Sequence, residues 1–383
     1  MGLDPISSPD MTKRRSRAFR ATACVAAAVA VAAAVLWALV GDGALFLVRF
    51  ERGAAGGKTA CRVEETRLSL RDGRSVPLRL YVPPGGYERV VLVIHGVHHG
   101  GYDEERLVFF AEKLVEAGFA VVTPELADLK AYEITERTVD DIAELARWTA
   151  ASPLSLGSRR DRRIGLVGIS FAGGLSISAA GRLDAASDPA FVLSFGGHGD
   201  LKRTMRFLAL GERSSGGWRA PHIYGQAVEV RMFAKQLVPE ADVAGLRDAL
   251  LAYLENRRGD AERLSADLGD EGQRLVRSCL DGKSEELGPI LAPLVERFDP
   301  APALSPALSP RPRCPVYLLH GADDNVIPAS ETTALAAALQ EGGEVHALVT
   351  DLIQHVELKR GGAEPPMSSY WRMARFWTGL LRE

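Results

Sequence analysis

A serine lies in a short run of small residues that suits a nucleophile. Gly168-Ile169-Ser170-Phe171-Ala172 follows an apolar run typical of a buried strand and precedes a stretch compatible with a helix. A sharp strand-to-helix turn would lift the Ser170 hydroxyl out of the sheet, and the first N–H groups of the helix would point at the group it attacks. Gly168 and Ala172 are small enough for the helix to fold back beside the strand, although Ala172 departs from the common G-x-S-x-G pattern. Because the pattern is short, its interpretation depends on partners elsewhere in the chain.

An acid and a base follow later in the chain, each after an apolar run typical of a strand. These residues are Asp324 and His355, which gives the order Ser, Asp, His. A serine hydroxyl becomes a good nucleophile when an imidazole takes its proton, and a carboxylate fixes the tautomer of that imidazole. Since the carboxyl ends of parallel strands meet at one edge of a sheet, we expect Ser170, Asp324 and His355 to lie together.

The elements that must position these residues alternate between strands and helices. Predicted strands cover 66–70, 76–82, 90–94, 119–122, 164–167, 191–195, 315–319 and 345–349, and predicted helices cover 107–117, 138–148, 171–182, 330–339 and 370–381. The unbroken apolar run 90–94 is typical of a strand that is buried on both faces. Thr138, with Asp141 three residues later, predicts the start of one helix. The alternation predicts an α/β fold with a doubly wound, mostly parallel sheet.

The segment 201–313 interrupts this alternation. It has no convincing buried strand, and its helical stripes of apolar residues lie among many charges. A helical insertion between two sheet strands is expected to form a cap over the strand ends.

The N-terminus carries a segment long enough to cross a membrane. The 20 residues from Ala21 to Val40 contain no charge, and at about 1.5 Å per residue they would span about 30 Å, the thickness of a bilayer core. The basic residues that precede them are Lys13, Arg14, Arg15, Arg17 and Arg20. This asymmetry predicts a single-pass membrane protein with its N-terminus in the cytoplasm and the rest of the chain outside. An uncleaved anchor is favoured over a cleaved signal peptide, which would instead release a secreted protein.

These features divide the chain into six predicted parts. They are a basic cytoplasmic N-terminus (1–20), a transmembrane signal-anchor (21–48), a linker (49–62), the first part of the α/β core (63–200), the helical cap (201–313) and the second part of the core (314–383).

Composition narrows the possible partners. The 383 residues carry a net charge of −3 without a basic helix or zinc-like spacing, so nucleic-acid binding is not expected. Cys24 lies in the apolar segment, which leaves Cys61, Cys279 and Cys314. An oxidising exterior permits at most one disulfide among these three.

The chain resembles the α/β-hydrolase fold family, in particular esterase- or lipase-like serine hydrolases with a helical cap. The resemblance covers about residues 75–383, with the cap matched only by position, and rests on His95-Gly96, the turn at Ser170, the segment from His320 to Pro328 and the late His355. It implies Ser170 as nucleophile, His355 as base and Asp324 as the acid that orients it. The family's spacing favours Asp324 over Asp323, and Asp200 is an alternative because some members take the acid from the preceding strand.

The resemblance also implies an oxyanion hole formed by the backbone N–H groups of Phe171 and Val97. We expect His98, His99 and His198 to reach the same end of the sheet and to bind substrate. Their loop positions favour this role over a metal site, and the proposed chemistry needs no cofactor.

The predicted function is a membrane-anchored enzyme that cleaves a carboxylic ester through an acyl-enzyme intermediate. The substrate would be a small acyl ester, and the anchor suggests a lipid-like one. A thioesterase, an acyltransferase or a peptidase could use the same triad. Two further alternatives are a non-catalytic hydrolase-like binding module and a metal-dependent hydrolase that uses His95, His98 and His99.

Overall fold

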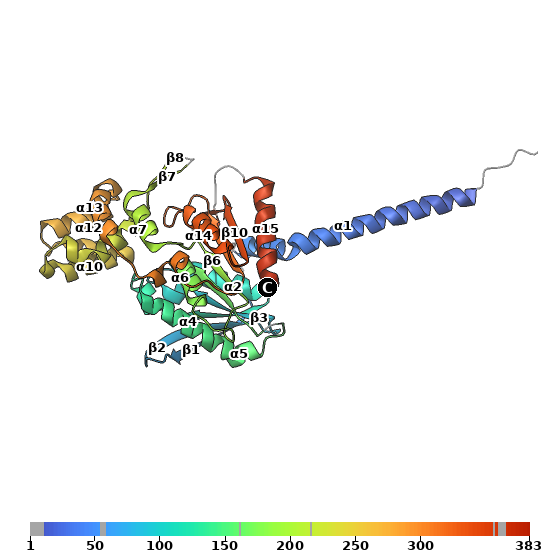
Figure 1. The fold of residues 1–383 in the computed structure, drawn as a ribbon, viewed down its shortest axis with the longest axis horizontal. Helices are drawn as coiled ribbons and strands as arrows, with labels where there is room; N and C mark the ends of the chain where they lie inside the picture. The colour runs from blue at the N-terminus through green and yellow to red at the C-terminus, as the bar shows by residue number, and fades with distance from the viewer. Residues whose placement is uncertain (1–10, 54–58, 161, 215–216, 355–356, 359–364) are drawn as a thin grey trace, which may run out of the picture.

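The computed structural model describes residues 11–53, 59–160, 162–214, 217–354, 357–358 and 365–383. Within them, eight strands form one sheet in the order β1-β2-β4-β3-β5-β6-β9-β10 (Figure 1). The strands are β1 (Arg62–Ser69), β2 (Ser75–Val82), β3 (Arg89–Ile94), β4 (Phe119–Pro124), β5 (Gly165–Ile169), β6 (Phe191–Phe195), β9 (Val316–Gly321) and β10 (Val345–Thr350). β2 is antiparallel to both neighbours, and the other neighbouring pairs are parallel. The sheet is therefore mixed, and the carboxyl ends of β3, β5, β6 and β9 share one edge.

Helices cover both faces of this sheet. α4 (Glu136–Ala151), α6 (Phe171–Ala180) and α14 (Ser330–Gln340) contribute to one apolar cluster, and α2 (Glu105–Glu116) and α15 (Met367–Arg382) contribute to a second. β3 is buried along its whole length between them, as its apolar run predicted. The short elements are α3 (Ala127–Lys130), α5 (Pro153–Leu156), β11 (Ile353–Gln354), β12 (Glu357–Leu358) and the 3-10 turn η1 (Gly101–Asp103).

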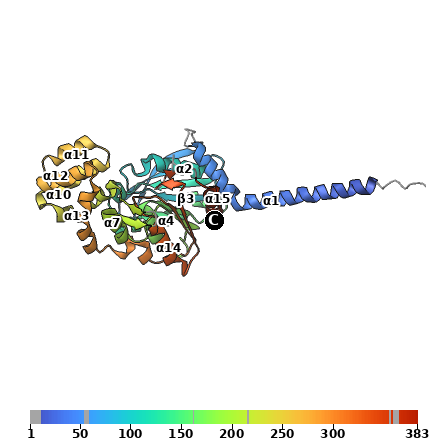
Figure 2. The same ribbon diagram turned by 90° about the horizontal axis from the view of Figure 1, so that it is seen from above.

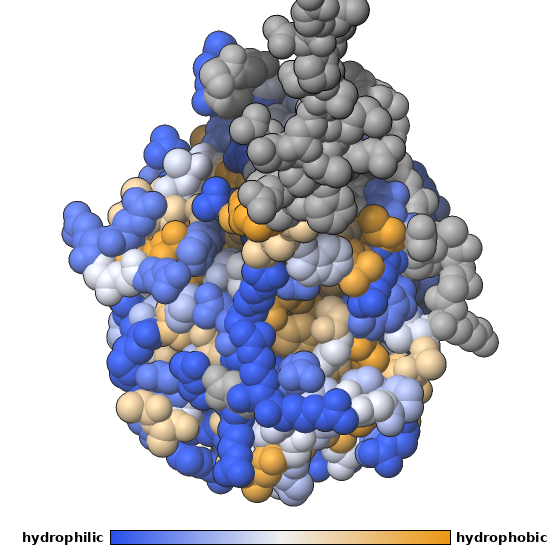
Figure 3. All heavy atoms as spheres, turned by 90° about the vertical axis from the view of Figure 1, so that its right-hand side faces the viewer, coloured by the Kyte–Doolittle hydropathy of each residue, from blue (hydrophilic) through white to orange (hydrophobic). Residues whose placement is uncertain are grey.

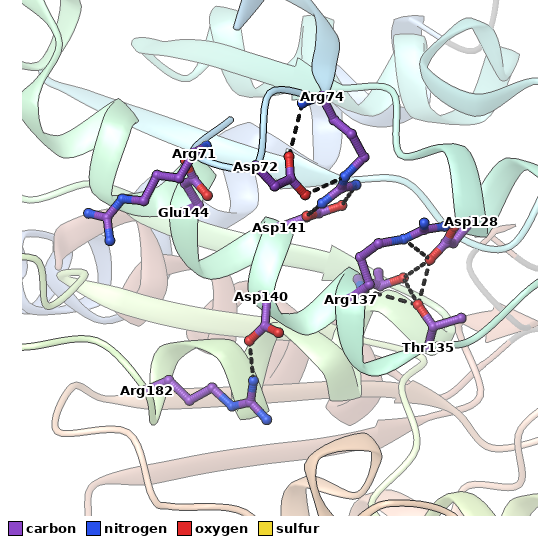
Figure 4. A network of polar contacts seen from close by, with 11 residues as sticks. Arg71, Asp72, Arg74, Asp128, Thr135, Arg137, Asp140, Asp141, Glu144 and Arg182 are labelled. Atoms are coloured by element: carbon purple, nitrogen blue, oxygen red, sulfur yellow. Dashed lines mark hydrogen bonds and ion pairs between the residues drawn. The ribbon is translucent and has the colours of Figure 1, made fainter. Parts of the chain in front are cut away.

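Polar contacts fasten α4 to the segments around it (Figure 4). Thr135 caps the helix by accepting a hydrogen bond from the N–H of Thr138, so the predicted start at Thr138 with Asp141 was wrong. Asp141 instead accepts hydrogen bonds, at 2.7 and 2.5 Å, from both terminal nitrogens of Arg74, which lies on the turn between β1 and β2. Two more ion pairs join this helix to its surroundings, Arg137 with Asp128 and Asp140 with Arg182.

A helical insertion separates β6 from β9. Its elements are α7 (Leu201–Leu210), β7 (Glu212–Ser214), β8 (Gly217–Arg219), α8 (Ile223–Met232), α9 (Ala234–Leu237), α10 (Glu240–Leu254), α11 (Arg258–Ser265), α12 (Asp270–Leu280), α13 (Ser284–Arg297) and the turns η2 (Pro302–Leu304) and η3 (Pro306–Leu308). β7 and β8 form a small antiparallel pair outside the main sheet. α10 to α13 gather at the end of the molecule farthest from α1 (Figure 2).

The N-terminal helix, α1 (Met11–Gly53), is continuous and projects from the body of the protein (Figures 1 and 2). Among the described residues, Ala30–Glu51 is long and apolar enough to cross a bilayer, a property that signal sequences and some core helices share. The helix runs five residues into the segment 49–62 that was predicted as a linker. The physical reason is that Phe46 and Phe50 lie one turn apart on the same face and pack against the sheet domain.

Candidate active site

Ser170 occupies a sharp turn between β5 and α6. Its backbone has φ 55° and ψ −135°, a conformation that residues with a Cβ rarely adopt and that costs about 1–3 kcal/mol. Two hydrogen bonds hold it: the N–H of Ser170 donates to the carbonyl of Phe195 at 2.8 Å, and the N–H of Gly173 donates to the carbonyl of Ser170 at 2.7 Å. The serine is therefore fixed in a strained turn at the carboxyl end of a central strand.

Close packing of the backbone explains the small residues around Ser170. A Cβ on Gly168 would lie 2.1 Å from the carbonyl oxygen of Ala172, and a Cβ on Gly173 would lie 2.4 Å from Ser194 Oγ. Real Cβ contacts essentially never fall below 3.0 Å, so α6 lies too close to β5 and β6 for a side chain at either glycine. Ala172, the departure from the common pattern, is fully buried, which shows that the core accommodates its methyl group.

Ser170 lies on the wall of a cavity of about 940 Å³, near the upper end of the range for small-molecule sites. Three parts of the chain form the wall. The sheet domain contributes Val97, His98, Phe109, Phe110, Phe171 and Phe195, the insertion contributes Met205, Leu208, His222, Tyr224, Val228 and Leu254, and α1 contributes Phe50. Charged and amide side chains also line it, among them Glu104, Glu105, Arg106 and Asn256. Apolar side chains are still the majority, so the cavity can hold an apolar group beside the serine.

Asp324 follows β9, and its carboxylate is fully buried. Its Oδ1 accepts hydrogen bonds from the N–H groups of Val326 at 2.8 Å and Ile327 at 2.9 Å. Its Oδ2 lies 3.3 Å from Nε2 of His320. These contacts fix the orientation of the carboxylate, and the neighbouring residues Asn325 and Val326 line the cavity.

The two alternative acids have different surroundings. Asp323 is exposed, and Asp200 caps the N-terminus of α7 by accepting a hydrogen bond from the N–H of Arg203 at 2.9 Å. The predicted base, His355, lies outside the described residues. Gln354, the residue before it, lines the cavity. The chain therefore brings both the loop of Asp324 and the strand that leads to His355 to the cavity of Ser170.

Of the three histidines that were predicted to bind substrate, His98 and His99 stack on each other with ring centroids 4.3 Å apart, and His198 lies in the core. His98 lines the cavity, and burial lowers its pKa. His99 Nδ1 lies 3.0 Å from the hydroxyl of Tyr132. His198 is fully buried, and its Nε2 donates a hydrogen bond to the carbonyl of Leu304 at 2.7 Å. In the described part of the chain, neither His99 nor His198 lines the cavity; His99 lies directly behind His98, and the hydrogen bond to Leu304 holds His198 in the core.

His95 joins two loops at the same edge of the sheet. Its Nδ1 donates a hydrogen bond to the carbonyl of Gly96 at 2.7 Å, and its Nε2 accepts one from the N–H of Leu126 at 3.0 Å. Burial lowers the pKa of His95 to about 4, which keeps the ring neutral. With both nitrogens occupied, this ring holds the loops together and offers no lone pair to a metal ion.

Val97 and Phe171, which were predicted to supply the oxyanion hole, both line the cavity. Phe171 is the first residue of α6, so its N–H lies at the positive end of a helix. Tyr224 of the insertion donates a hydrogen bond to the carbonyl of Val97 at 3.1 Å, and Tyr132 donates one to the carbonyl of Leu254 at 3.0 Å. The partners of the first hydrogen bond are 127 positions apart in the sequence, and those of the second are 122 positions apart. No local pattern in the sequence therefore indicates these two hydrogen bonds.

One group of side chains in the described part of the chain has the spacing of a metal site. The possible ligand atoms of Glu344, His346 and Glu383 lie within 4.8 Å of one another. His346 Nε2 lies 2.9 Å from Glu344, and Tyr317 donates a hydrogen bond to Glu383 at 2.8 Å. Glu344 directly precedes β10, at the edge opposite to Ser170. The described cysteines Cys61, Cys279 and Cys314 are free thiols.

The order of the strands and the serine at the β5–α6 turn define the class of protein: the chain has an α/β-hydrolase fold, as the resemblance implied. No protein-family model and no curated protein matches it. Similar solved structures include an esterase from Pyrococcus furiosus (14% identity, 78% of this chain and 84% of that chain, TM-score 0.46). An acylaminoacyl peptidase from Pyrococcus horikoshii is 15% identical over 87% of this chain and 43% of that chain, with a TM-score of 0.46. A dienelactone hydrolase from Anabaena variabilis is 14% identical over 84% of this chain and 98% of that chain, with a TM-score of 0.44.

Proposed function

We propose that this protein is a membrane-anchored serine hydrolase that cleaves carboxylic esters. The observation that carries the proposal is the conformation of Ser170, which is held at positive φ between a central strand and a helix, on the wall of a large and mainly apolar cavity. Strain of this kind persists where the surrounding structure enforces it, and it is concentrated at functional sites. A strand–turn–helix corner is the setting in which a serine serves as a nucleophile.

In the proposed reaction, Ser170 Oγ attacks the carbonyl carbon of the ester while its proton passes to His355. The bond to the alcohol oxygen then breaks, and the alcohol leaves with that proton. Water gives a proton to His355 and attacks the acyl-enzyme, and the acid departs as the proton returns to Ser170. Asp324 would orient His355 and stabilise its charged form, a role that its buried and firmly held carboxylate supports.

The negative charge that develops on the carbonyl oxygen needs hydrogen-bond donors in place before the reaction. We assign this role to the N–H groups of Phe171 and Val97. The position of Phe171 at the start of α6 supports the assignment. Tyr224 also supports it, because its bond to the Val97 carbonyl restrains the loop that carries the second donor.

The proposed topology places the N-terminus in the cytoplasm and the hydrolase domain outside, with α1 as an uncleaved anchor. The basic residues before the apolar segment support the orientation. Burial of Phe46 in the second apolar cluster supports retention of the helix, since cleavage within the docked part would remove a core residue.

Labelling of the full chain in detergent with a fluorophosphonate, followed by mass spectrometry, tests this function. We expect an adduct on Ser170 that is absent in Ser170→Ala and strongly reduced in His355→Ala. Ser176→Ala is a matched control: Ser176 lies on the same helix, is buried, and its Oγ has no hydrogen-bond partner among the described residues. A folded wild-type protein that takes up no probe and hydrolyses no ester would support the non-catalytic alternative instead.

A further inference from the structure

The two halves of α1 have different surroundings. Every residue from 30 to 39 is exposed and apolar or small, and this half projects away from the sheet domain. From Val40 onward the helix packs against α15. Phe46 is 2% exposed, its ring centroid lies 4.5 Å from that of Trp377, and the N–H of Gly43 donates to Thr378 Oγ1 at 2.9 Å. The second half is therefore part of the folded domain.

This docked half reaches the cavity of Ser170. Phe50 lines the cavity, and its ring packs edge-on against that of Phe109, another lining residue, with centroids 4.8 Å apart. At 1.5 Å per residue, Phe50 lies about 16 Å along the helix axis from Leu39, the last residue of the exposed half. A membrane around the exposed half would therefore lie close to one wall of the catalytic cavity.

The surface around α1 is suited to a membrane boundary. On the docked half, Leu45 and Val48 remain exposed, at 41% and 43%. Figure 3 views the molecule from the direction in which α1 projects, and apolar residues lie among hydrophilic ones around the base of the helix. Exposed apolar side chains thus occur along α1 as far as Val48, two residues before Phe50.

We infer that Phe50 forms part of the acyl-binding wall and that the substrate is a long-chain acyl ester taken from the membrane along α1. This inference rests on the proposed function, because it names the substrate class of the same serine. Phe50, Phe109 and Phe110 would hold the acyl chain, and Ser170 would meet its carbonyl group. The anchor helix then has two roles, since it holds the enzyme at the bilayer and completes the cavity.

Chain-length preference tests the inference. We would measure kcat/KM of the full chain in detergent micelles for p-nitrophenyl butanoate and p-nitrophenyl dodecanoate. Phe50→Ala should lower the value for dodecanoate about tenfold, the usual effect of losing an apolar contact in a pocket, and leave butanoate unchanged. Leu156→Ala is the control, because Leu156 lies on α5, is 54% exposed and is not among the described residues that line the cavity or lie on α1.

Several outcomes would overturn the inference. An equal loss on both esters, or no loss on either, would show that Phe50 does not contact the acyl chain. If Phe50→Ala does not fold, Phe50→Leu should still lower the preference for dodecanoate. In vesicles, a long-chain ester in the same bilayer should be hydrolysed much faster than one in separate protein-free vesicles, and equal rates would rule out entry along α1. A wild-type protein that is inert to both esters and to fluorophosphonate would show instead that the proposed function is wrong.

Discussion

Replacement of Gly168 by alanine tests whether close packing of α6 on β5 positions Ser170, the proposed nucleophile. The added Cβ would lie 2.1 Å from the carbonyl oxygen of Ala172, and bringing that distance to 3.0 Å requires a shift of about 0.9 Å. The obstacle is backbone at the start of α6, so the helix or the strand must move. Overpacking of this kind costs about 1–3 kcal/mol of stability. A displacement of about 1 Å at a reacting group costs about 100-fold in rate.

The assay combines chemical denaturation with kcat/KM for a short ester. We expect Gly168→Ala to lose about 1–3 kcal/mol of unfolding free energy and about two orders of magnitude in kcat/KM. Gly259→Ala is the control, because no atom of the described residues lies within 4 Å of a Cβ at that helical position. It should gain about 0.5–1 kcal/mol and keep full activity. Wild-type stability and activity in Gly168→Ala would refute the argument that backbone contact fixes Ser170.

Two more predictions concern strain and buried charge. Ser170→Gly should be about 1 kcal/mol more stable than Ser170→Ala, because glycine adopts φ 55° without strain; equal stability in denaturation would show that the turn is unstrained. Glu229 on α8 is fully buried, its carboxylate oxygens have no hydrogen-bond partner among the described residues, and burial raises its pKa well above the usual 4.5. In the unfolded chain the Glu229 carboxyl group loses its proton at a lower pH than it does in the native protein. The free energy of unfolding therefore falls as pH rises above about 4.5. The Tm of Glu229→Gln should therefore match that of wild type near pH 4 and exceed it near pH 8, and parallel pH profiles would contradict this.

The sheet could be predicted from the sequence because its strands are local and strongly patterned. The run 90–94 is apolar at every position, and β3 is buried on both faces. Helix boundaries were harder to predict. Thr138 and Asp141 have the spacing of a capping pair, but Asp141 pairs with Arg74 from a different part of the chain. The C-terminal end of α1 was also hard to predict. The segment 49–62 has the composition of a linker, but Phe50 packs against the sheet domain, and this tertiary contact extends the helix.

The residues of the candidate site also differ in how far a local pattern in the sequence predicts them. Ser170 and Asp324 lie in turns where the backbone restricts the residue types nearby, and those restrictions appear as short motifs. His198 follows a strand as a site residue would, yet it faces Leu304 in the core. Neither Phe50 nor Tyr224 carries a motif, because any residue of suitable size and polarity could fill a wall or support a loop.

The residues proposed to carry out the reaction have local motifs, whereas the residues that would select the substrate have none. Ser170, the proposed nucleophile, and the carboxylate of Asp324 are held at the carboxyl edge of the sheet through hydrogen bonds to neighbouring backbone. The volume beside them is bounded by the sheet domain, the insertion and α1, and the last two reach the site through tertiary contacts alone. Under the proposed function, we expect substitutions in those two segments to alter the accepted acyl group while Ser170 and Asp324 keep their geometry. If the proposed function holds, the substrate preference of this protein should therefore depend on which side chains α1 and the insertion place against Ser170, because the motif around the serine carries no information about it.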